Sequence, residues 1–401
     1  MNRCVVTGCG AISAIGNNLA ETLDSLRNNR GGIAPFENPG RERQPIRVAA
    51  VVRNFDPAQH FSSTELALLD RFAQFAVVAA REAQADAGIT FARDDVRVAV
   101  VIGSGIGGKS SDDEASERLY TGAGRVHPLT IPRVMLSSVA SHVSTFLGVV
   151  GPTFATSSAC SSAAHAIGIG AMMIRQGLVD VVVAGGAEAP LCYGLLCAWE
   201  SMRIMDPTTC RPFSKNRRGI VLGEGAGIVI LESLAHAEAR NATVYAELAG
   251  VGFSADAHHI TVPTVDGPAR AMRAAVEDAG LVPDNVDYIN AHGTGTQVND
   301  VTETRAIRTV FGDAADRLSV SSTKSAHGHA LGASPALELI CTLLGMRHGF
   351  VPATLNYTEP DPECDLDYVP NRASETGIRN ALSNAFAFGG LNACLVARAM
   401  T

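Results

Sequence analysis

A single cysteine stands among small residues in the segment TSSACSSAAHAIG, residues 156–168. The segment is typical of the start of a helix, with Cys160 close to its first turn. A cysteine there lies at the positive end of the helix dipole, which favours the thiolate, the nucleophilic form. Free cysteine also behaves as a small apolar core residue. The segment alone therefore leaves two interpretations open, a nucleophile and a packing position.

Two further segments place histidine and lysine where strand-like runs give way to loops. NAHGTGT puts His292 just after an apolar run, and SSTKSAHGHALG puts Lys324 and His329 ahead of a predicted helix. In α/β proteins the carboxyl ends of the strands gather on one side of the sheet, where ligands bind. We therefore expect these side chains to meet Cys160 and the turn at 386–390 at one site.

Two motifs resemble cofactor sites but lack the rest of the pattern. GSGIGG (103–108) matches the dinucleotide fingerprint G-x-G-x-x-G, but polar, glycine-broken residues follow it and no second strand ends in an acid. His327 and His329 form an H-x-H pair with no cysteine or carboxylate in a recognised ligand spacing. We therefore expect a tight turn at 103–108, no nucleotide and no metal.

The 401-residue chain has the composition of a globular α/β protein, with 46% apolar and 18% charged residues and 39 glycines beside apolar runs. A formal net charge of −8 argues against nucleic-acid binding. Nine scattered cysteines without a C-x-x-C pair favour a reducing cytoplasm over a disulfide framework. The N-terminus has no secretory signal pattern, and no run of about 18 apolar residues predicts a membrane helix.

The order of the predicted elements repeats along the chain. A helix ending in Ala-Gly, a short loop, a strand and a glycine-rich turn occur at 70–108 and again at 268–296, and VVTGCGAIS resembles AELAGVGFS. The repeat predicts two similar α/β halves. We place the N-terminal half, with Cys160, at 1–245 and the C-terminal half, with both histidine segments, at 246–401.

Together, five segments resemble the β-ketoacyl-acyl carrier protein synthases, condensing enzymes of the thiolase superfamily. They are SSACSSAAHAIG, RPFSKNRRGIVLGEGAG, NAHGTGT, TKSAHGHALGA and NAFAFGGLN. The chain is most similar to elongating type II synthases, and AWESMR, SADAHHIT and NYTEPDPECDLDYVPN resemble nodulation-type and polyene-making members. The resemblance implies a thiolase-like α/β fold, in which two similar halves form a layered α-β-α-β-α core.

The resemblance implies a decarboxylative Claisen condensation that gives 3-oxoacyl-acyl carrier protein. Cys160 would hold the acyl chain, and malonyl-acyl carrier protein would supply the extending unit. His292 and His329 would hydrogen-bond the malonyl thioester carbonyl and stabilise the enolate left by decarboxylation. Lys324 would organise the second histidine, His329, with support from Glu338.

The resemblance also implies a binding surface for the acyl chain and the pantetheine arm. The backbone N–H groups of Cys160 and Phe388 would bind the acyl oxyanion, and the Phe388 ring would swing to admit malonyl. The other residues implied at the gate or along the substrate are Ile106, Thr294, Thr296, Phe386, Gly389 and Gly390. No cofactor is implied, because the substrates arrive on the phosphopantetheine of the carrier protein.

Two other functions remain as alternatives. A thiolase-type enzyme using coenzyme A is opposed by HGH and by FGG, where thiolases carry a second catalytic cysteine. A non-catalytic subunit that shapes the pocket of another synthase is opposed by the intact Cys160, His292, Lys324 and His329. The implied partners are acyl carrier protein and a second synthase chain. A homodimer is favoured over a heterodimer with a homologue that lacks the cysteine.

Three departures from the family pattern affect these expectations. Gln297 and Val298 follow HGTGT where many relatives carry proline, and Pro335 stands where glycine is common. The segment STELALLDR (63–71) lacks the basic cluster with which many relatives dock acidic carrier protein. Two interpretations stay open for the basic residues of a later segment, a replacement for that cluster or a solvated loop without a partner. These residues are Arg203, Arg211, Lys215, Arg217 and Arg218.

Overall fold

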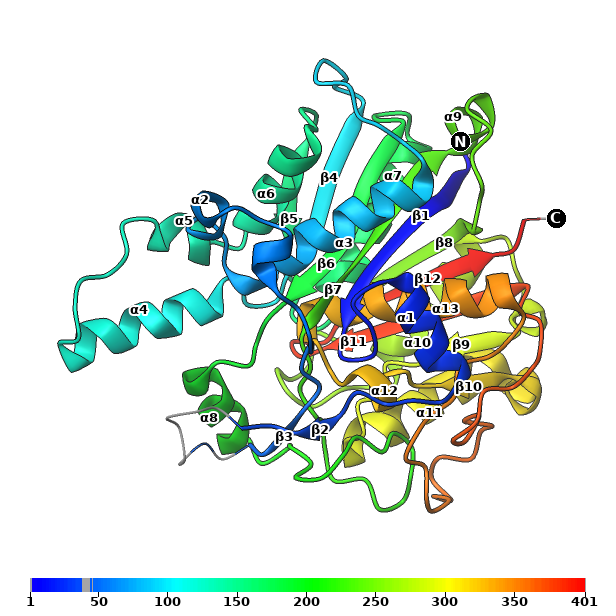
Figure 1. The fold of residues 1–401 in the computed structure, drawn as a ribbon. Coiled ribbons are helices and arrows are strands. Elements are labelled where there is room, and N and C mark those ends of the chain that lie inside the picture. The colour runs from blue at the N-terminus through cyan, green and yellow to red at the C-terminus, as the bar shows by residue number, and fades with distance from the viewer. Residues whose placement is uncertain (1, 38–43, 45, 401) are drawn as a thin grey trace.

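A computed structural model describes residues 2–37, 44 and 46–400 of the chain. Helices and strands alternate along most of it, and both termini lie on the same side of the molecule (Figure 1). No helix of the described residues combines the length and the apolar character needed to cross a membrane.

The elements of the first part of the chain are β1 (Cys4–Ser13), α1 (Leu19–Arg27), β2 (Ala34–Pro35), β3 (Val48–Ala49), α2 (Ser63–Leu66), α3 (Arg71–Ala87), β4 (Val98–Gly103), α4 (Lys109–Thr121), α5 (Thr130–Val134), α6 (Ser138–Leu147), β5 (Thr153–Thr156), α7 (Ser162–Arg175), β6 (Val181–Glu188), α8 (Tyr193–Ser201), β7 (Gly225–Ser233) and α9 (Leu234–Ala239). The elements of the second part are β8 (Ala246–Ala255), α10 (Asp266–Asp278), β9 (Tyr288–Asn290), α11 (Gln297–Phe311), β10 (Ser319–Ser321), α12 (Lys324–His327), α13 (Ser334–His348), β11 (Asn380–Ala387) and β12 (Leu391–Arg398).

One ten-stranded sheet runs through both parts, in the order β10-β9-β11-β12-β8-β1-β7-β6-β4-β5. Read outward from the centre, the order is β1-β7-β6-β4-β5 on one side and β8-β12-β11-β9-β10 on the other. Each strand that the first part contributes to this sheet therefore has a counterpart in the second, in the same sequence order. The two sets meet where β1 pairs with β8 through Val5–Glu247 and Val6–Ala246. The predicted repeat of helix, strand and turn is confirmed, with α3 and β4 matching α10 and β9.

Paired glycines explain why the similar segments VVTGCGAIS and AELAGVGFS occur near the start of each part. Gly8 and Gly10 lie on β1 and face α3, and Gly250 and Gly252 lie on β8 and face α10. A Cβ atom at any of the four would come within 2.0–2.3 Å of a helix carbonyl oxygen. Residues two apart on a strand share a face, so each glycine pair lets one helix lie directly on its strand.

The helix α3 shows how the sequence sets the limits of an element. Asp70 Oδ1 accepts the Phe72 N–H at 3.2 Å, which caps the first turn. Gly88 ends the helix with a φ of +60°, a left-handed conformation that glycine adopts at little cost. The predicted helix at 70–88 therefore matches the structure at both ends.

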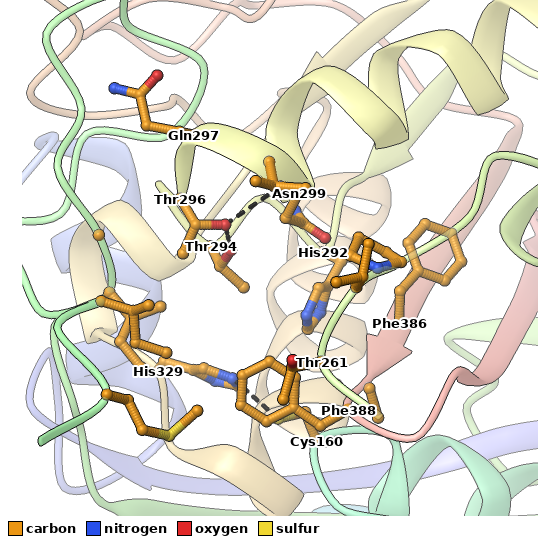
Figure 2. Close-up of a pocket in the computed structure, with 18 of the residues that line it drawn as sticks. Cys160, Thr261, His292, Thr294, Thr296, Gln297, Asn299, His329, Phe386 and Phe388 are labelled. Atoms are coloured by element: carbon orange, nitrogen blue, oxygen red, sulfur yellow. Dashed lines mark hydrogen bonds between the residues drawn. The ribbon is translucent and has the colours of Figure 1, made fainter. Parts of the chain in front are cut away.

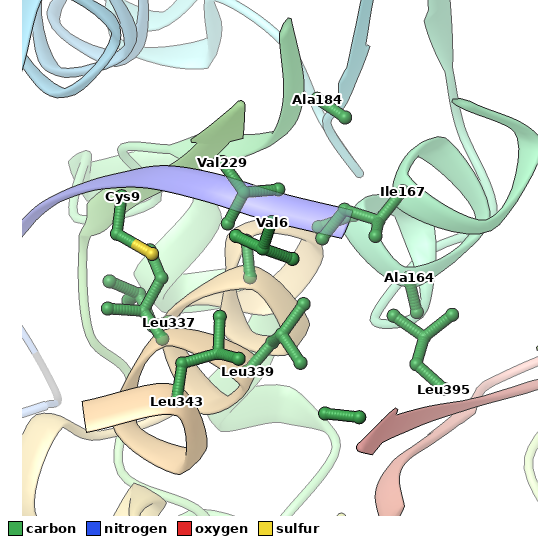
Figure 3. Close-up of a cluster of buried hydrophobic side chains, with 14 of the residues drawn as sticks. Val6, Cys9, Ala164, Ile167, Ala184, Val229, Leu337, Leu339, Leu343 and Leu395 are labelled. Atoms are coloured by element: carbon green, nitrogen blue, oxygen red, sulfur yellow. The ribbon is translucent and has the colours of Figure 1, made fainter. Parts of the chain in front are cut away.

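The elements stack in five layers, as the thiolase-like fold requires. Helices α3 and α6 cover the outer face of one half of the sheet, and α10 covers the outer face of the other. Between the two halves lie α7 and α13, whose apolar residues meet β1 and β12 in the central core (Figure 3). The labelled members of this core are Val6, Cys9, Ala164, Ile167, Ala184, Val229, Leu337, Leu339, Leu343 and Leu395. Burying each leucine contributes roughly 1.5–3 kcal/mol, so this core fixes the two central helices whose N-termini border the site.

Candidate active site

A cavity of about 410 Å³ opens where the strand ends of both halves meet (Figure 2). Its lining comes from the junction β5–α7, the loops after β9 and β10, and the turn between β11 and β12. The predicted residues that line it are Cys160, His292, Thr294, Thr296, His329, Phe386, Phe388 and Gly390. The structure therefore brings together segments that the sequence separates by more than 200 residues.

Cys160 sits in a tight turn immediately before α7. Ala159 has a φ of +51°, and the N–H groups of Ser161 and Ser162 donate to the carbonyls of Ser158 and Ala159. The left-handed conformation costs an alanine of order 1 kcal/mol, and backbone strain of this kind concentrates at functional sites. The turn aims Sγ at the cavity, 3.2 Å from His329 Nε2.

The ionisation state of Cys160 differs from the expectation. Burial raises the pKa of its thiol to about 12, against the opposing effects of the Lys324 charge and the Phe388 backbone N–H, which donates to the sulfur. The shift towards thiolate expected from the helix end is therefore not found, because desolvation of the buried thiol has the larger effect on its pKa. The site therefore places a thiol beside an imidazole.

His329 lies on a loop that is hydrogen-bonded to the segment just before the strand β7. Its backbone N–H donates to Val221 O at 2.7 Å, and its carbonyl accepts the Gly223 N–H at 3.0 Å. Both contacts use the GIVLGEGAG end of the motif that precedes β7. Burial, reinforced by the Lys324 charge, holds the pKa of His329 well below its usual range, so the ring is neutral.

His292 is the second ring over the cavity, with its centroid 5.7 Å from that of His329 and the two planes at 85°. Burial first, and the Lys324 charge second, hold its pKa well below the usual range. Lys324 Nζ lies 3.4 Å from His292 Nδ1. An ammonium only donates, so Nδ1 is the acceptor and the proton of the neutral ring is on Nε2. His292 therefore presents an N–H donor to the cavity.

The contact of Lys324 corrects one expectation. Its ammonium hydrogen-bonds Glu338 and His292, whereas His329 Nδ1 hydrogen-bonds Ser334. Lys324 and Glu338 are both fully buried and form an ion pair behind the histidines. The expected pair of Lys324 with Glu338 is present, but it orients the first histidine and not the second.

Two buried carboxylates that we did not predict hold the loops of the site. Glu188 accepts the N–H groups of Gly105, Ile106 and Gly332 at 2.7–3.2 Å, which ties the 103–108 turn to the His329 loop. Glu303 accepts the N–H of His292 and that of the residue after it, both at 2.8 Å. The only sequence signal for Glu188 is an acid at the end of the apolar run VVVAGGAE.

Two predicted residues lie beside the cavity instead of lining it. Ile106 packs into the apolar cluster that contains Cys160 and Leu331. Gly389 lies in the turn after β11, and its N–H donates to Ile260 O at 2.7 Å. The lining residues that sequence reasoning missed are Trp199, Met202, Ile204, Ile220, Ile260, Thr261, Val262, Pro263 and Asn299.

The five basic residues expected to dock a carrier protein fall into two groups. Arg217 is buried and pairs with Asp361 at 2.5 Å, so its expected surface role is wrong. Arg211 pairs with Asp206 and Lys215 pairs with Glu359. Arg203 and Arg218 are exposed, line the cavity, and have no ion pair with any described residue.

Comparison with family models gives two matches that follow one another along the chain. The model described as "Beta-ketoacyl synthase, N-terminal domain" matches residues 1–237, and "Beta-ketoacyl synthase, C-terminal domain" matches residues 245–358. Among curated proteins, the chain is 47% identical over 399 residues to nodulation protein E of Rhizobium sp. (strain N33), covering 99% of each chain. It is 41% identical over 403 residues to 3-oxoacyl-[acyl-carrier-protein] synthase 2 of Staphylococcus aureus (strain COL), covering 98% of this chain and 97% of the relative.

Solved structures give the same result. The ishigamide ketosynthase/chain length factor aligns over 100% of both chains with a TM-score of 0.95 and 37% identity. A type II polyketide ketosynthase in complex with its acyl-carrier protein and bound to the hexaketide (AntDE:AntF) aligns over 100% of both chains with a TM-score of 0.91 and 33% identity.

Proposed function

This chain belongs to the β-ketoacyl synthase family, and on that premise we propose that Cys160, His292 and His329 are the groups that perform its reaction. The reaction is the condensation of an acyl chain with malonyl-acyl carrier protein, with loss of carbon dioxide, to give 3-oxoacyl-acyl carrier protein. The observation that carries the residue assignment is the 3.2 Å contact of Cys160 Sγ with His329 Nε2 in a cavity that also receives His292.

In the first half-reaction Cys160 takes the acyl chain from a carrier thioester. The sulfur attacks the thioester carbonyl while its proton passes to His329 Nε2. The tetrahedral oxyanion forms next to the sulfur, within reach of the Phe388 N–H that donates to the sulfur in the free enzyme. Preorganised N–H donors stabilise such an anion. The carrier thiolate leaves and takes the proton from His329, so the ring is neutral again.

In the second half-reaction the malonyl thioester occupies the cavity opposite acyl-Cys160. The bond to the malonyl carboxylate breaks, carbon dioxide leaves, and the electron pair forms a thioester enolate. The Nε2–H of His292, held by Lys324, and the Nε2–H of His329 both donate to the enolate oxygen. The enolate carbon attacks the acyl thioester, and the released Cys160 thiolate takes a proton from solvent.

The acyl carrier protein docks at the cavity mouth in this proposal. The mouth combines the exposed cations Arg203 and Arg218 with exposed apolar side chains, which are Met202, Ile260, Val262 and Val298. An acidic protein that carries a thioester on a long arm suits this mixture of charge and apolar surface. Reversing Arg203 and Arg218 to glutamate should raise the KM for carrier substrates, and the same change at Lys215, which pairs with Glu359, is the matched control.

We propose a homodimer as the working assembly. The strand β5 is one of the two edge strands of the ten-stranded sheet, and α4 and α5 project from the body beside it (Figure 1). This region carries exposed apolar side chains, namely Leu119, Tyr120, Ile131, Met135 and Phe154. An open sheet edge beside apolar helices is a surface that a partner chain covers. Light scattering of the chain expressed alone tests this. An inactive monomer rescued by a homologue that lacks the cysteine would instead indicate a heterodimer.

A mass measurement tests the function directly. Incubation with an acyl carrier thioester should add the acyl mass at Cys160, and later addition of malonyl-acyl carrier protein should release a 3-oxoacyl product. Cys160→Ser is the control and should acquire no acyl group. Primers of graded length then define the chain length that the enzyme accepts. An unmodified Cys160 in an enzyme that still forms product would contradict the assignment.

A further inference from the structure

His329 has a different partner at each ring nitrogen. Nε2 lies 3.2 Å from Cys160 Sγ, and Nδ1 lies 2.9 Å from Ser334 Oγ. Ser334 is the first residue of α13 and is fully buried, as His329 nearly is. No other hydrogen bond to Nδ1 occurs within the part of the chain that the structure describes. Which nitrogen of the neutral ring carries the proton therefore depends on one thiol and one hydroxyl.

The start of α13 explains why a hydroxyl has this position. The first turn of a helix usually offers free backbone N–H groups to an acceptor placed before it. Here the residue after Ser334 is Pro335, which has no N–H. A backbone N–H can only donate, and it would hold Nδ1 permanently as an acceptor. A serine hydroxyl can donate or accept.

We propose that Ser334 is a positioning residue that allows His329 to exchange between its two neutral tautomers during the reaction. The proposal rests on the proposed roles of Cys160 and His329. It adds a residue to the machinery and a requirement that the hydroxyl reverse its hydrogen bond between the two half-reactions.

Acyl transfer needs the first tautomer. To accept the Cys160 proton, His329 Nε2 must carry a lone pair, so the proton of the neutral ring lies on Nδ1. Nδ1–H then donates to Ser334 Oγ, both before the transfer and while the ring briefly holds two protons. Without the hydroxyl this N–H would be buried without a partner, which costs about 1–3 kcal/mol.

Condensation needs the second tautomer. To donate to the enolate oxygen, Nε2 must carry the proton, so Nδ1 carries the lone pair. Between the half-reactions Nε2 takes a proton from water in the cavity and Nδ1 gives one up to water, so the ring stays neutral. The Ser334 hydroxyl then rotates and donates to Nδ1. The low pKa of His329 supports this account, because burial and the Lys324 charge disfavour the doubly protonated ring as the resting donor.

The test measures the two half-reactions separately in Ser334→Ala. Acyl transfer is followed by the mass gained at Cys160. Decarboxylation of malonyl-acyl carrier protein is followed in a Cys160→Gln background, in which no acyl chain is needed. We expect both rates to fall about tenfold and the melting temperature to fall by only a few degrees, since one buried hydrogen bond to a neutral partner is lost. Ser334→Thr keeps a hydroxyl and should restore both rates to within about threefold of the parent, allowing for its extra methyl group.

A matched control removes a buried hydroxyl elsewhere. Ser138 opens α6, is buried, and its Oγ has no hydrogen-bond partner among the described residues. Ser138→Ala should leave both rates unchanged. Loss of only one half-reaction in Ser334→Ala would overturn the proposal, because it would mean that the hydroxyl serves one tautomer. Full activity would overturn it as well. A parent enzyme that neither acylates Cys160 nor decarboxylates malonyl would instead count against the proposed function.

Discussion

The two halves of the molecule share a strand order and a helix arrangement, but their equivalent junctions carry different groups. The junction β5–α7 is a short turn that presents the sulfur of Cys160. Its counterpart, the junction β10–α13, is longer and presents His329. The same junction carries Lys324, whose ammonium hydrogen-bonds His292. One scaffold therefore supplies the proposed nucleophile from one side and the proposed hydrogen-bond donors from the other. The two halves therefore differ in the residues of their loops, while their strand order is the same.

The halves also differ at the connection between their last two strands. Residues 189–224 join β6 to β7, include α8, and reach the mouth of the cavity. Residues 388–390 join β11 to β12 in a tight turn that places Phe388 against Cys160. The long connection lines the mouth of the cavity, and the short one brings the Phe388 N–H to the sulfur of Cys160. Separate variants in each half should therefore damage separate steps.

The largest expected effect comes from breaking the N-terminal half at its nucleophile. Cys160→Ser should lower acyl transfer by about 10⁴-fold or more, as loss of a nucleophile does in other acyl-transfer enzymes. Its melting temperature should stay close to that of the parent, because the change removes little volume. Mass spectrometry and thermal unfolding measure the two quantities. Retained acylation at another cysteine would show that the nucleophile is misassigned.

The next effect comes from the C-terminal half. His292→Ala should slow malonyl decarboxylation by about 10²–10³-fold, because it removes one donor to the enolate oxygen. Acyl transfer should change little, since His292 contacts Lys324 and not Cys160. His329→Ala should slow both steps, because His329 touches the sulfur. Carbon dioxide release and acyl mass, measured on the same preparations, distinguish the two rings. Equal profiles for both variants would contradict the division between them.

A smaller effect is expected on the pH dependence of stability, where one buried glutamate of each half can be compared. Burial raises the pKa of Glu188 and of Glu303 from 4.5 to about 7. Each folded carboxyl therefore binds a proton more tightly than the unfolded one, so its contribution to stability falls as pH rises from about 4.5 to about 7. The change is at most on the order of 3 kcal/mol for each group. Glu188→Gln and Glu303→Gln should each flatten the loss of unfolding free energy between pH 5 and pH 8.

Urea unfolding at the two pH values provides the measurement. If the halves are supported in the same way, the two glutamine variants should flatten the slope by similar amounts. A variant that loses stability equally at both pH values would show that its carboxyl is already ionised in the folded protein at pH 5. That outcome would show that the two carboxyl groups support their halves differently, and it would contradict the raised pKa at that position.

Much of the fold was predictable because it depends on local patterns that repeat. Apolar runs ending in glycine predicted the strands, and the repeated order of helix, strand and glycine-rich turn predicted two similar halves. The positions of Cys160, His292 and His329 at junctions predicted that they meet. Local patterns indicate where an element ends, and in this architecture the ends converge.

The remaining features depend on three-dimensional surroundings that the sequence does not display. The pKa of Cys160 is set by burial, which exceeds the effect of the neighbouring helix end. Lys324 stands closer in sequence to His329, but its ammonium reaches His292. Trp199 and the loop at 260–263 are apolar, so their letters are typical of a core, and only the folded chain shows that they border the cavity. Ser334 is typical of a helix start, and only the folded chain shows that its hydroxyl contacts His329 Nδ1.

The smallest expected effect tests whether the long connection of one half restrains the short turn of the other. Trp199, on α8, stacks on Phe388, with ring centroids 6.1 Å apart and planes at 24°. An aromatic pair contributes roughly 0.5–1.5 kcal/mol, so Trp199→Ala should shift the predicted Phe388 gate by roughly two- to tenfold towards the open state. The ratio of unproductive malonyl decarboxylation to condensation should rise by that factor. Trp199→Phe keeps an aromatic ring and is the matched control. Because Trp199 is the one tryptophan of the chain, acylation of Cys160 should also change the tryptophan emission if the Phe388 ring moves. An unchanged emission together with an unchanged ratio in Trp199→Ala would show that the two halves do not communicate through this stack.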